Sequence, residues 1–177
     1  MHTKPYTVNI PAAAAGAFRV GKTHRLGDTH LYHGEVSIMS DRLQEFQEAE
    51  KFLAAAHGDV LCAGLGLGVL HQALMSNDKV KSVTIVEKYQ DVIDLVWDHC
   101  AKDDRFRLIH ADIYDVHFDK SNDLFDVGWF DSWTSETGEP DDPFNPSNYE
   151  KDMRERFGDI VSDMHFWKSF GGYTEAV

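Results

Sequence analysis

Three carboxylates stand where apolar runs of the sequence end: Glu87, Asp112 and Asp131. A carboxylate can accept hydrogen bonds from hydroxyl or amino groups, and it can take a proton from a nucleophile. If the apolar runs are parallel strands, their carboxyl ends meet at one edge of a sheet, where ligands bind in such folds. The three acids are therefore expected to share one site.

A glycine-rich segment precedes these acids. Val60–Ala63 is a short apolar run, and Gly64, Gly66 and Gly68 follow it at every second position. Glu87 comes nineteen residues after Gly68. Strand, glycine loop, helix, strand and acid is the layout of a nucleoside-binding βαβ unit, in which the glycines let backbone approach the ligand and the acid accepts hydrogen bonds from ribose. The pattern predicts a nucleoside-cofactor binder, and an enzyme.

The spacing also bears on which cofactor binds. NAD sites favour G-x-G-x-x-G, whereas the third glycine here comes one residue earlier. Asp112, behind the run Phe106–His110, supplies an acid where an adenine amino group could be recognised. This combination favours S-adenosylmethionine over NAD.

The same motifs resemble those of class I methyltransferase-fold proteins, and most of all the spermidine-synthase-like branch. In that branch a β-hairpin and a helix precede the glycine loop, as residues 30–57 do here. The matching segments, within residues 31–133, are Val60–Gly68, Lys81–Glu87, Asp91–Ile93, His110–Asp112 and Phe125–Asp131.

The resemblance implies a role for each matched position. The backbone of the glycine loop would lie beside the methionine part and the ribose, Glu87 would hold the ribose hydroxyls, and Asp112 with Ile113 would contact adenine. Asp131 falls where aminopropyltransferases keep an acid that accepts a proton from the attacking amine, so it is the predicted catalytic residue. The predicted cofactor-binding residues are Gly64, Leu65, Gly66, Gly68, Glu87, Lys88, Asp112 and Ile113.

Departures from the branch leave the reaction open. Aminopropyltransferases usually have Gly-Gly-Gly-Asp-Gly-Gly where this chain has Gly64-Leu-Gly-Leu-Gly-Val, and an Asp-Pro pair where it has Ser132-Trp133-Thr134. Gln44–Glu48 only approximately occupies the place of their Tyr-His-Glu motif, and the sixth and seventh strands are expected to be missing. Three alternatives remain: a methyltransferase acting on a small molecule, aminopropyl transfer from decarboxylated S-adenosylmethionine, and a nucleoside-binding module without turnover.

Charge and aromatic residues narrow the choice of partner. The formal net charge of −13 makes nucleic acid an unlikely partner and suits a small cationic substrate, although it also suits solubility alone. Trp129, Phe130 and Trp133 flank Asp131 and could enclose a cation, or could belong to the core and a loop. The histidines show no tetrahedral metal-ligand pattern, so no metal is expected.

The order of elements predicts an α/β fold, a reduced Rossmann-like parallel sheet with helices on both faces and a small N-terminal β annex. The annex is assigned to residues 1–39, with a hairpin at 30–39 around Gly34, and the cofactor-binding domain to 40–177. A helix capped by Ser40-Asp41 and closed by Gly58 is expected between them. Further helices are expected over 69–75, 90–100 and 149–167, and a substrate loop over 134–148.

The 177 residues suffice for one domain with a sizeable core. No run approaches the roughly 18 apolar residues of a membrane helix. The N-terminus lacks a signal-peptide pattern, and the two cysteines form no C-x-x-C pair, so a cytoplasmic protein with reduced thiols is expected. A homodimer could cover the open edge of the sheet.

Overall fold

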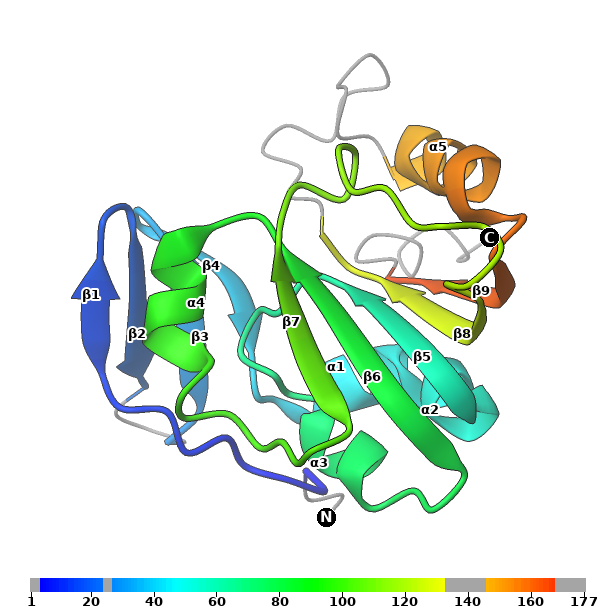
Figure 1. The fold of residues 1–177 in the computed structure, drawn as a ribbon. Helices are drawn as coiled ribbons and strands as arrows, with labels where there is room; N and C mark the ends of the chain where they lie inside the picture. Colours follow the sequence, from blue (N-terminus) through cyan, green and yellow to red (C-terminus); the bar gives the residue numbers. More distant parts are fainter. Residues whose placement is uncertain (1–3, 24–26, 133–145, 168–177) are drawn as a thin grey trace, which may run out of the picture.

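Two β-sheets make up the framework of the molecule, a four-stranded antiparallel sheet near the N-terminus and a five-stranded parallel sheet (Figure 1). The computed structural model describes residues 4–23, 27–132 and 146–167. None of the described helices is long and apolar enough to cross a membrane.

The antiparallel sheet is the predicted annex. Its strands follow one another in chain order: β1 (Ala13–Ala15), β2 (Phe18–Lys22), β3 (Thr29–His33) and β4 (Val36–Ser40). Gly34, at the turn between β3 and β4, has a φ of 58°, a conformation that glycine adopts without steric cost. The predicted hairpin around Gly34 is confirmed, while the division into domains at residues 39 and 40 stays a prediction.

The parallel sheet has the order β7-β6-β5-β8-β9. Its strands are β5 (Gly58–Ala63), β6 (Val80–Glu87), β7 (Phe106–His110), β8 (Phe125–Phe130) and β9 (Val161–Phe166). The chain moves outward from β5 to β7 and then returns to the other side of β5. The strand order therefore reverses between β5 and β8, and in open α/β sheets this reversal point is where ligands bind.

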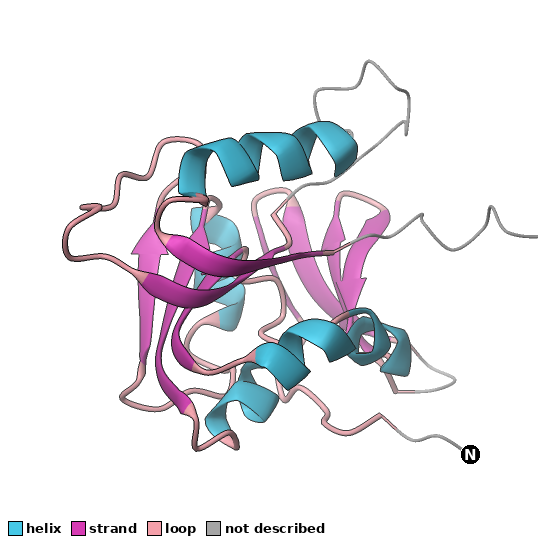
Figure 2. Ribbon diagram, turned by 90° about the vertical axis from the view of Figure 1, so that its right-hand side faces the viewer, coloured by secondary structure: helices cyan, strands magenta, loops and turns pink. Residues whose placement is uncertain are grey.

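Helices cover both faces of the parallel sheet, as predicted. Val60 and Cys62 of β5 share a core with α1 (Leu43–Glu48), α2 (Glu50–Ala55), α3 (His71–Met75), α4 (Gln90–Val96) and the annex. Leu61 and Ala63, which alternate with them, pack on the opposite face with α5 (Pro146–Phe157). Figure 2 shows α5 on its own side of the sheet.

The helix expected to begin at Ser40-Asp41 differs from the prediction. It is two short helices that meet at Ala49, and Arg42 occupies the N-cap without a side-chain cap bond. The predicted cap is wrong because the carboxylate of Asp41, fully buried, binds elsewhere. It accepts hydrogen bonds from Lys4 Nζ at 2.9 Å and Thr29 N at 2.9 Å, and so fixes the N-terminal segment to the annex.

The predicted final helix over 149–167 is also wrong in its second half. The helix α5 ends at Phe157, and Gly158 N donates to Arg154 O at 3.0 Å. Val161 then pairs with Phe125 as β9 begins. Apolar spacing continues helically through this segment, but pairing with β8 satisfies the backbone of an otherwise open sheet edge. Most of the predicted substrate loop over 134–148 lies outside the described residues.

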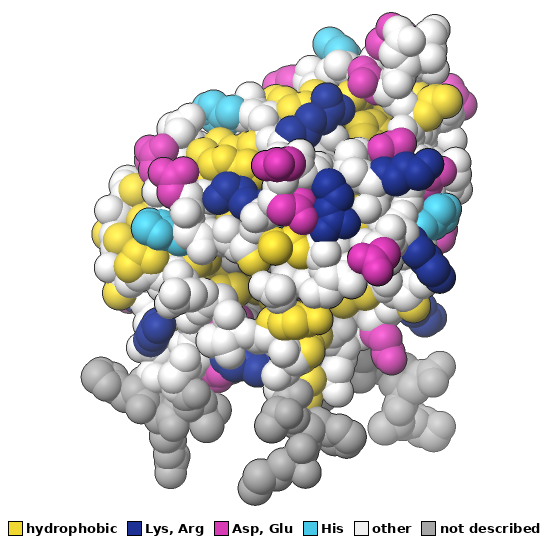
Figure 3. Space-filling view, turned by 60° about the horizontal axis from the view of Figure 1, so that its bottom comes forward, with side chains coloured by type: hydrophobic (Ala, Val, Ile, Leu, Met, Phe, Trp, Pro, Cys, Tyr) yellow, Lys and Arg dark blue, Asp and Glu magenta, His cyan; other side chains and the backbone are white. Residues whose placement is uncertain are grey.

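Charged side chains on the molecular surface are mixed in sign. On the face drawn in Figure 3, Lys and Arg side chains are interspersed with Asp and Glu side chains. Ion pairs such as Lys120 with Asp159, 2.7 Å apart, are well exposed. This face therefore offers no broad field of one sign to a charged partner.

Candidate active site

A cavity of about 200 Å³ lies at the strand-order reversal, between the carboxyl ends of the strands and the annex. Its wall includes Asp131 and six of the eight predicted cofactor-binding residues: Gly64, Gly66, Glu87, Lys88, Asp112 and Ile113. The other two, Leu65 and Gly68, line a smaller cavity next to it. The structure thus brings the predicted residues together around the glycine loop.

The glycine loop depends on backbone conformations that other residues rarely adopt. Gly64 has a φ of 101°, and a Cβ placed on it would lie 2.2 Å from the carbonyl oxygen of Asp131. Gly66 has a φ of 51°, and its Cβ would lie 2.3 Å from Met39 Sδ. The predicted need for glycine at position 66 is met by this positive φ. The ends of β5 and β8 can approach this closely only because residue 64 has no side chain.

Glu87 holds the loop in place from the end of β6. It is 6% exposed, and its two carboxylate oxygens accept hydrogen bonds from Leu65 N and Tyr89 N, each at 2.8 Å. Burial raises the pKa of Glu87, while these backbone N–H groups act in the opposite direction. The backbone N–H groups of Lys88 and Gly66 add to this stabilisation, and the carboxylate lines the larger cavity, where it can accept a hydrogen bond from a ligand.

An ion pair lies beside Glu87 at the same wall. Lys88 Nζ is 2.9 Å from Asp112 Oδ2, and Tyr114 N donates to Asp112 Oδ1 at 3.0 Å. Burial would raise the pKa of Asp112, but the hydrogen bonds from Lys88 and Tyr114 outweigh it and leave the pKa lowered. Asp112 is therefore an anion that can accept a hydrogen bond from an amino group, and Ile113 supplies apolar surface next to it.

The annex forms the opposite wall of the larger cavity, which the sequence did not predict. Phe18 stacks on His33 with ring centroids 4.6 Å apart, and Tyr89 lies 4.9 Å from Phe18. Leu31 and Met39 complete this side. The alternation of apolar residues along β2 and β3 was a signal that one face is buried, but it did not show that a cavity lies beneath it.

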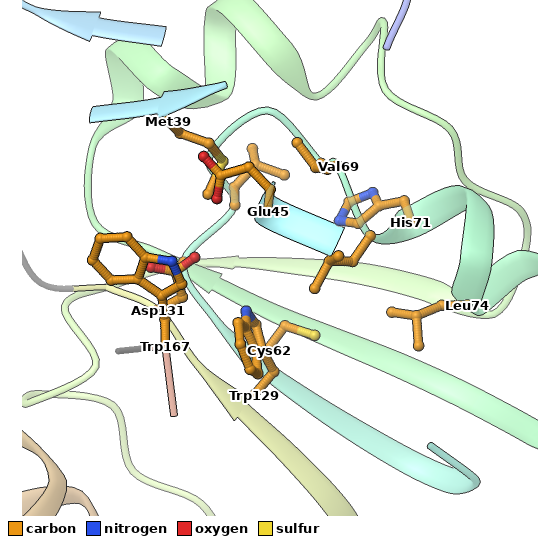
Figure 4. Close-up of a pocket in the computed structure, with 13 residues that line it drawn as sticks. Met39, Glu45, Cys62, Val69, His71, Leu74, Trp129, Asp131 and Trp167 are labelled. Carbon is orange, nitrogen blue, oxygen red and sulfur yellow. The ribbon is translucent and has the colours of Figure 1, made fainter. Parts of the chain in front are cut away.

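The smaller cavity, of about 30 Å³, lies on the other side of the glycine loop. Figure 4 shows Asp131 and Trp167 together at one end, Cys62 and Trp129 along it, and His71 and Leu74 at the far end. Glu45 reaches into it from α1. A space of this size holds one or two water molecules, or the head of an ammonium group.

The carboxyl groups of the smaller cavity have pKa values close to neutral pH. Burial raises the pKa of Asp131 to about 8, and the negative charges of Glu45 and Glu48 act in the same direction. Burial, and then the charge of Glu48, raises the pKa of Glu45 to about 7. Carboxyl groups with pKa values near neutrality can release or accept a proton under physiological conditions.

The aromatic residues around Asp131 are only partly those predicted. Trp129 lines the smaller cavity, but it also belongs to the core, where its ring stacks on Phe52 with centroids 5.2 Å apart. Phe130 points to the other face of the sheet, where it packs with Phe157. Trp133 lies outside the described residues. Trp167, which the sequence did not suggest, lines the cavity, and its Nε1 donates to Glu48 Oε2 at 2.5 Å.

Two hydroxyl groups that form a hydrogen bond also line the larger cavity, and the sequence did not predict this pair. Ser132 Oγ and Tyr149 Oη are 2.5 Å apart, and both residues line the cavity. Tyr149 comes from the first turn of α5, seventeen positions away from Ser132. No periodicity in the sequence brings the two together.

Other reactive side chains near the site are neutral. Burial raises the pKa of the Cys62 thiol to about 12 and lowers the pKa of His71 to about 4. His71 Nδ1 lies 2.9 Å from the carbonyl oxygen of Ala101. Within the described ranges, no three His, Cys, Asp or Glu side chains form a group that could hold a metal ion. The described side chains that line the two cavities include the carboxyl groups of Glu45, Glu87, Asp112 and Asp131 and the hydroxyl groups of Ser132 and Tyr149.

No protein-family model and no curated protein matches this sequence. Solved protein structures, in contrast, do match this chain. Spermidine synthase in complex with the transition-state analogue AdoDATO aligns with a TM-score of 0.52 and 18% identity over 86% of this chain and 65% of its own. Spermidine synthase from Thermotoga maritima aligns with a TM-score of 0.49 and 17% identity, over 85% of this chain and 63% of its own. M. jannaschii TYW2 in complex with AdoMet aligns with a TM-score of 0.42 and 17% identity, over 73% of this chain and 60% of its own.

The chain thus spans less than two thirds of each of these structures. At such low identity the likeness concerns the path of the backbone. It shows that this chain has the fold of spermidine synthase, the class I methyltransferase fold that its sequence motifs predicted.

Proposed function

We propose that this chain is an S-adenosylmethionine-dependent transferase that acts on a small cationic molecule, with methyl transfer as the first candidate reaction. The observation that carries the proposal is the position of Asp131, a carboxyl group that borders both the larger and the smaller cavity. A group at this border can touch a donor on one side and an acceptor on the other.

The residues of the larger cavity fit a nucleoside. Glu87 lines this cavity with a carboxylate that can accept hydrogen bonds from ribose hydroxyls, and Asp112 with Ile113 offers an anionic acceptor and an apolar surface for a base. Gly66 lines the cavity, and the absence of a side chain on it leaves room for Met39. When bound, S-adenosylmethionine supplies a methyl group on a sulfonium centre, so the protein needs chiefly to align the nucleophile and exclude water.

The smaller cavity fits the head of a cationic acceptor. Glu45 and Asp131 are carboxyl groups that can ionise when a cation binds beside them, and Trp129 and Trp167 provide aromatic surface that attracts cations. Asp131, with its pKa near 8, can take a proton from an ammonium or hydroxyl group and so free a lone pair for attack.

A second candidate is aminopropyl transfer from decarboxylated S-adenosylmethionine, and one observation favours it. Among the described residues that line the two cavities, Lys88 is the only Lys or Arg, and it is paired with Asp112. Within the described part of the chain, the end of the cavity near Asp131 therefore offers no cationic side chain to a methionine carboxylate. A donor tail that carries an amine and no carboxylate suits this end better.

The products decide between these reactions. The protein is incubated with either donor and a panel of amine, hydroxyl and carboxylate acceptors, and the products are identified by mass spectrometry. S-adenosylhomocysteine marks methyl transfer, and methylthioadenosine marks aminopropyl transfer. The variant D131N should keep donor affinity and lose about 10²–10⁴-fold in turnover, the usual effect of a lost general base. Tight donor binding without either product from any acceptor would indicate a nucleoside-binding module instead.

A further inference from the structure

The two cavities share three lining residues, which therefore form the boundary between them. These residues are Met39, Gly64 and Asp131. Under the proposed function, a group carried by the nucleoside sulfur must pass between these three residues to meet the acceptor, and we call this passage the opening. The dimensions of the opening then limit which groups can be transferred.

Two of the three borders are fixed by backbone. Gly64 N donates to Val86 O at 2.8 Å, and Asp131 N donates to Ala63 O at 2.9 Å, so both residues continue the pairing of the central strands. The carbonyl oxygen of Asp131 already lies 2.2 Å from the position of a Cβ on Gly64. The backbone of neither residue can move without breaking the end of the sheet.

The third border is a side chain from another sheet. Met39 belongs to β4 of the annex, and its Sδ accepts a hydrogen bond from Leu67 N at 3.2 Å. Figure 4 shows its side chain reaching over the loop next to Glu45. Methionine is unbranched and has three rotatable bonds, so its end can shift where backbone cannot. Met39 is therefore the adjustable border of the opening.

We infer that Met39 is a specificity-determining residue, which sets how long a group on the nucleoside sulfur can extend from the larger cavity into the smaller one. The inference rests on the proposed function, because it needs a sulfur-bearing nucleoside in the larger cavity. It adds a residue of the annex to a site whose other borders come from the parallel sheet.

The test uses adenosines that carry methylthio, propylthio or hexylthio at the 5′ position, and calorimetry on the full chain. Wild-type protein should bind the methylthio compound well and the hexylthio compound poorly. M39A should bind the hexylthio compound about tenfold or more tightly than wild type does, since several methylene groups gain an apolar surface. The ratio of its affinities for the hexylthio and methylthio compounds should therefore rise about tenfold or more above the wild-type ratio.

Two further variants control for effects on the loop. M39L keeps the volume and removes the sulfur acceptor of Leu67 N, so it should keep the wild-type preference for short groups. M39F narrows the opening and should reject the propylthio compound, which gives a readout even if M39A melts too early for calorimetry.

An identical dependence on chain length in wild type, M39A and M39F would overturn the inference and leave the proposed function standing, because the methylthio compound would still bind. Absence of binding for every adenosine, in every variant with a normal melting curve, would overturn the proposed function and the inference with it.

Discussion

Glu87 has two roles under the proposed function. Its carboxylate anchors the glycine loop through Leu65 N, and it is proposed to accept hydrogen bonds from ribose hydroxyls. We predict that E87A weakens S-adenosylhomocysteine binding by about 2–3 kcal/mol, or about a hundredfold, because charge-assisted hydrogen bonds are lost. E87Q keeps one oxygen acceptor and should lose less. Calorimetry measures both, and an E87A protein that binds like wild type would remove Glu87 from the cofactor site.

Asp131 should make stability depend on pH in a direction that follows from its raised pKa. The pKa rises from 3.8 in the unfolded chain to about 8 in the folded protein, so the folded state binds more protons between these values. The free energy of unfolding should then fall as pH rises from about 4 to about 8. We predict that D131N removes this loss, and that its advantage over wild type is smallest near pH 4 and largest above pH 8.

The advantage of D131N above pH 8 should exceed about 1 kcal/mol, or about 2–4 °C in Tm for a chain of this length. Thermal melts at several pH values measure it. D104N, which removes one negative charge from an exposed turn, is the matched control and should not show the same pH dependence. If D131N and D104N shift the Tm equally at every pH, the pKa of Asp131 is not raised in the ligand-free protein.

At the scale of elements, the meeting of β5 and β8 depends on a glycine. We predict that G64A lowers the free energy of unfolding by more than about 3 kcal/mol, because alanine would combine a positive φ with a clash against the backbone of Asp131. Denaturant melts give the value. G34A is the matched control: its φ is also positive, at 58°, but nothing lies within 4 Å of the added Cβ, so it should cost only about 1–2 kcal/mol. Equal costs would mean that the two strand ends can move apart.

Elements with strong local signals were predicted well, and those decided by distant partners were not. Phe106–His110 is a strand with the predicted bounds, and the strand before Glu87 ends where the sequence indicated. Asp41 looked like a helix cap, yet Lys4 and Thr29 engage its carboxylate from elsewhere in the chain. The helical spacing of Met153, Phe157 and Ile160 could not show that Val161 would instead pair with β8.

For the whole molecule, the annex and the parallel sheet together line the larger cavity. The sheet half of the larger cavity followed from motifs, because carboxyl ends of parallel strands converge at one edge. The annex half, with Phe18, His33 and Met39, depends on how two sheets dock, and no short motif encodes that docking. The same holds for Trp167, which reaches the smaller cavity from the end of β9.

Because both sheets line the cavity, a ligand that contacts both of them should stabilise their packing against each other. We predict that S-adenosylhomocysteine raises the hydrogen-exchange protection of amides in β2, β3 and β4 as well as in the glycine loop. Mass spectrometry of peptides from residues 18–40 measures this, with β7 peptides away from the cavity as an internal reference. Protection confined to the parallel sheet would show that the annex does not contribute to the bound state.

The pairing of β5 with β8 also has a consequence for the order in which the polypeptide can fold. Asp59 N donates to Asp126 Oδ2 across a separation of 67 residues, whereas each strand of the annex pairs with its neighbour in the chain. Contacts between residues far apart in sequence form slowly, because a long loop must close before they contribute. On a ribosome, the annex hairpins can form as soon as they emerge. The central strand β5, already synthesised, must wait for the chain up to Phe130 before its second edge is covered.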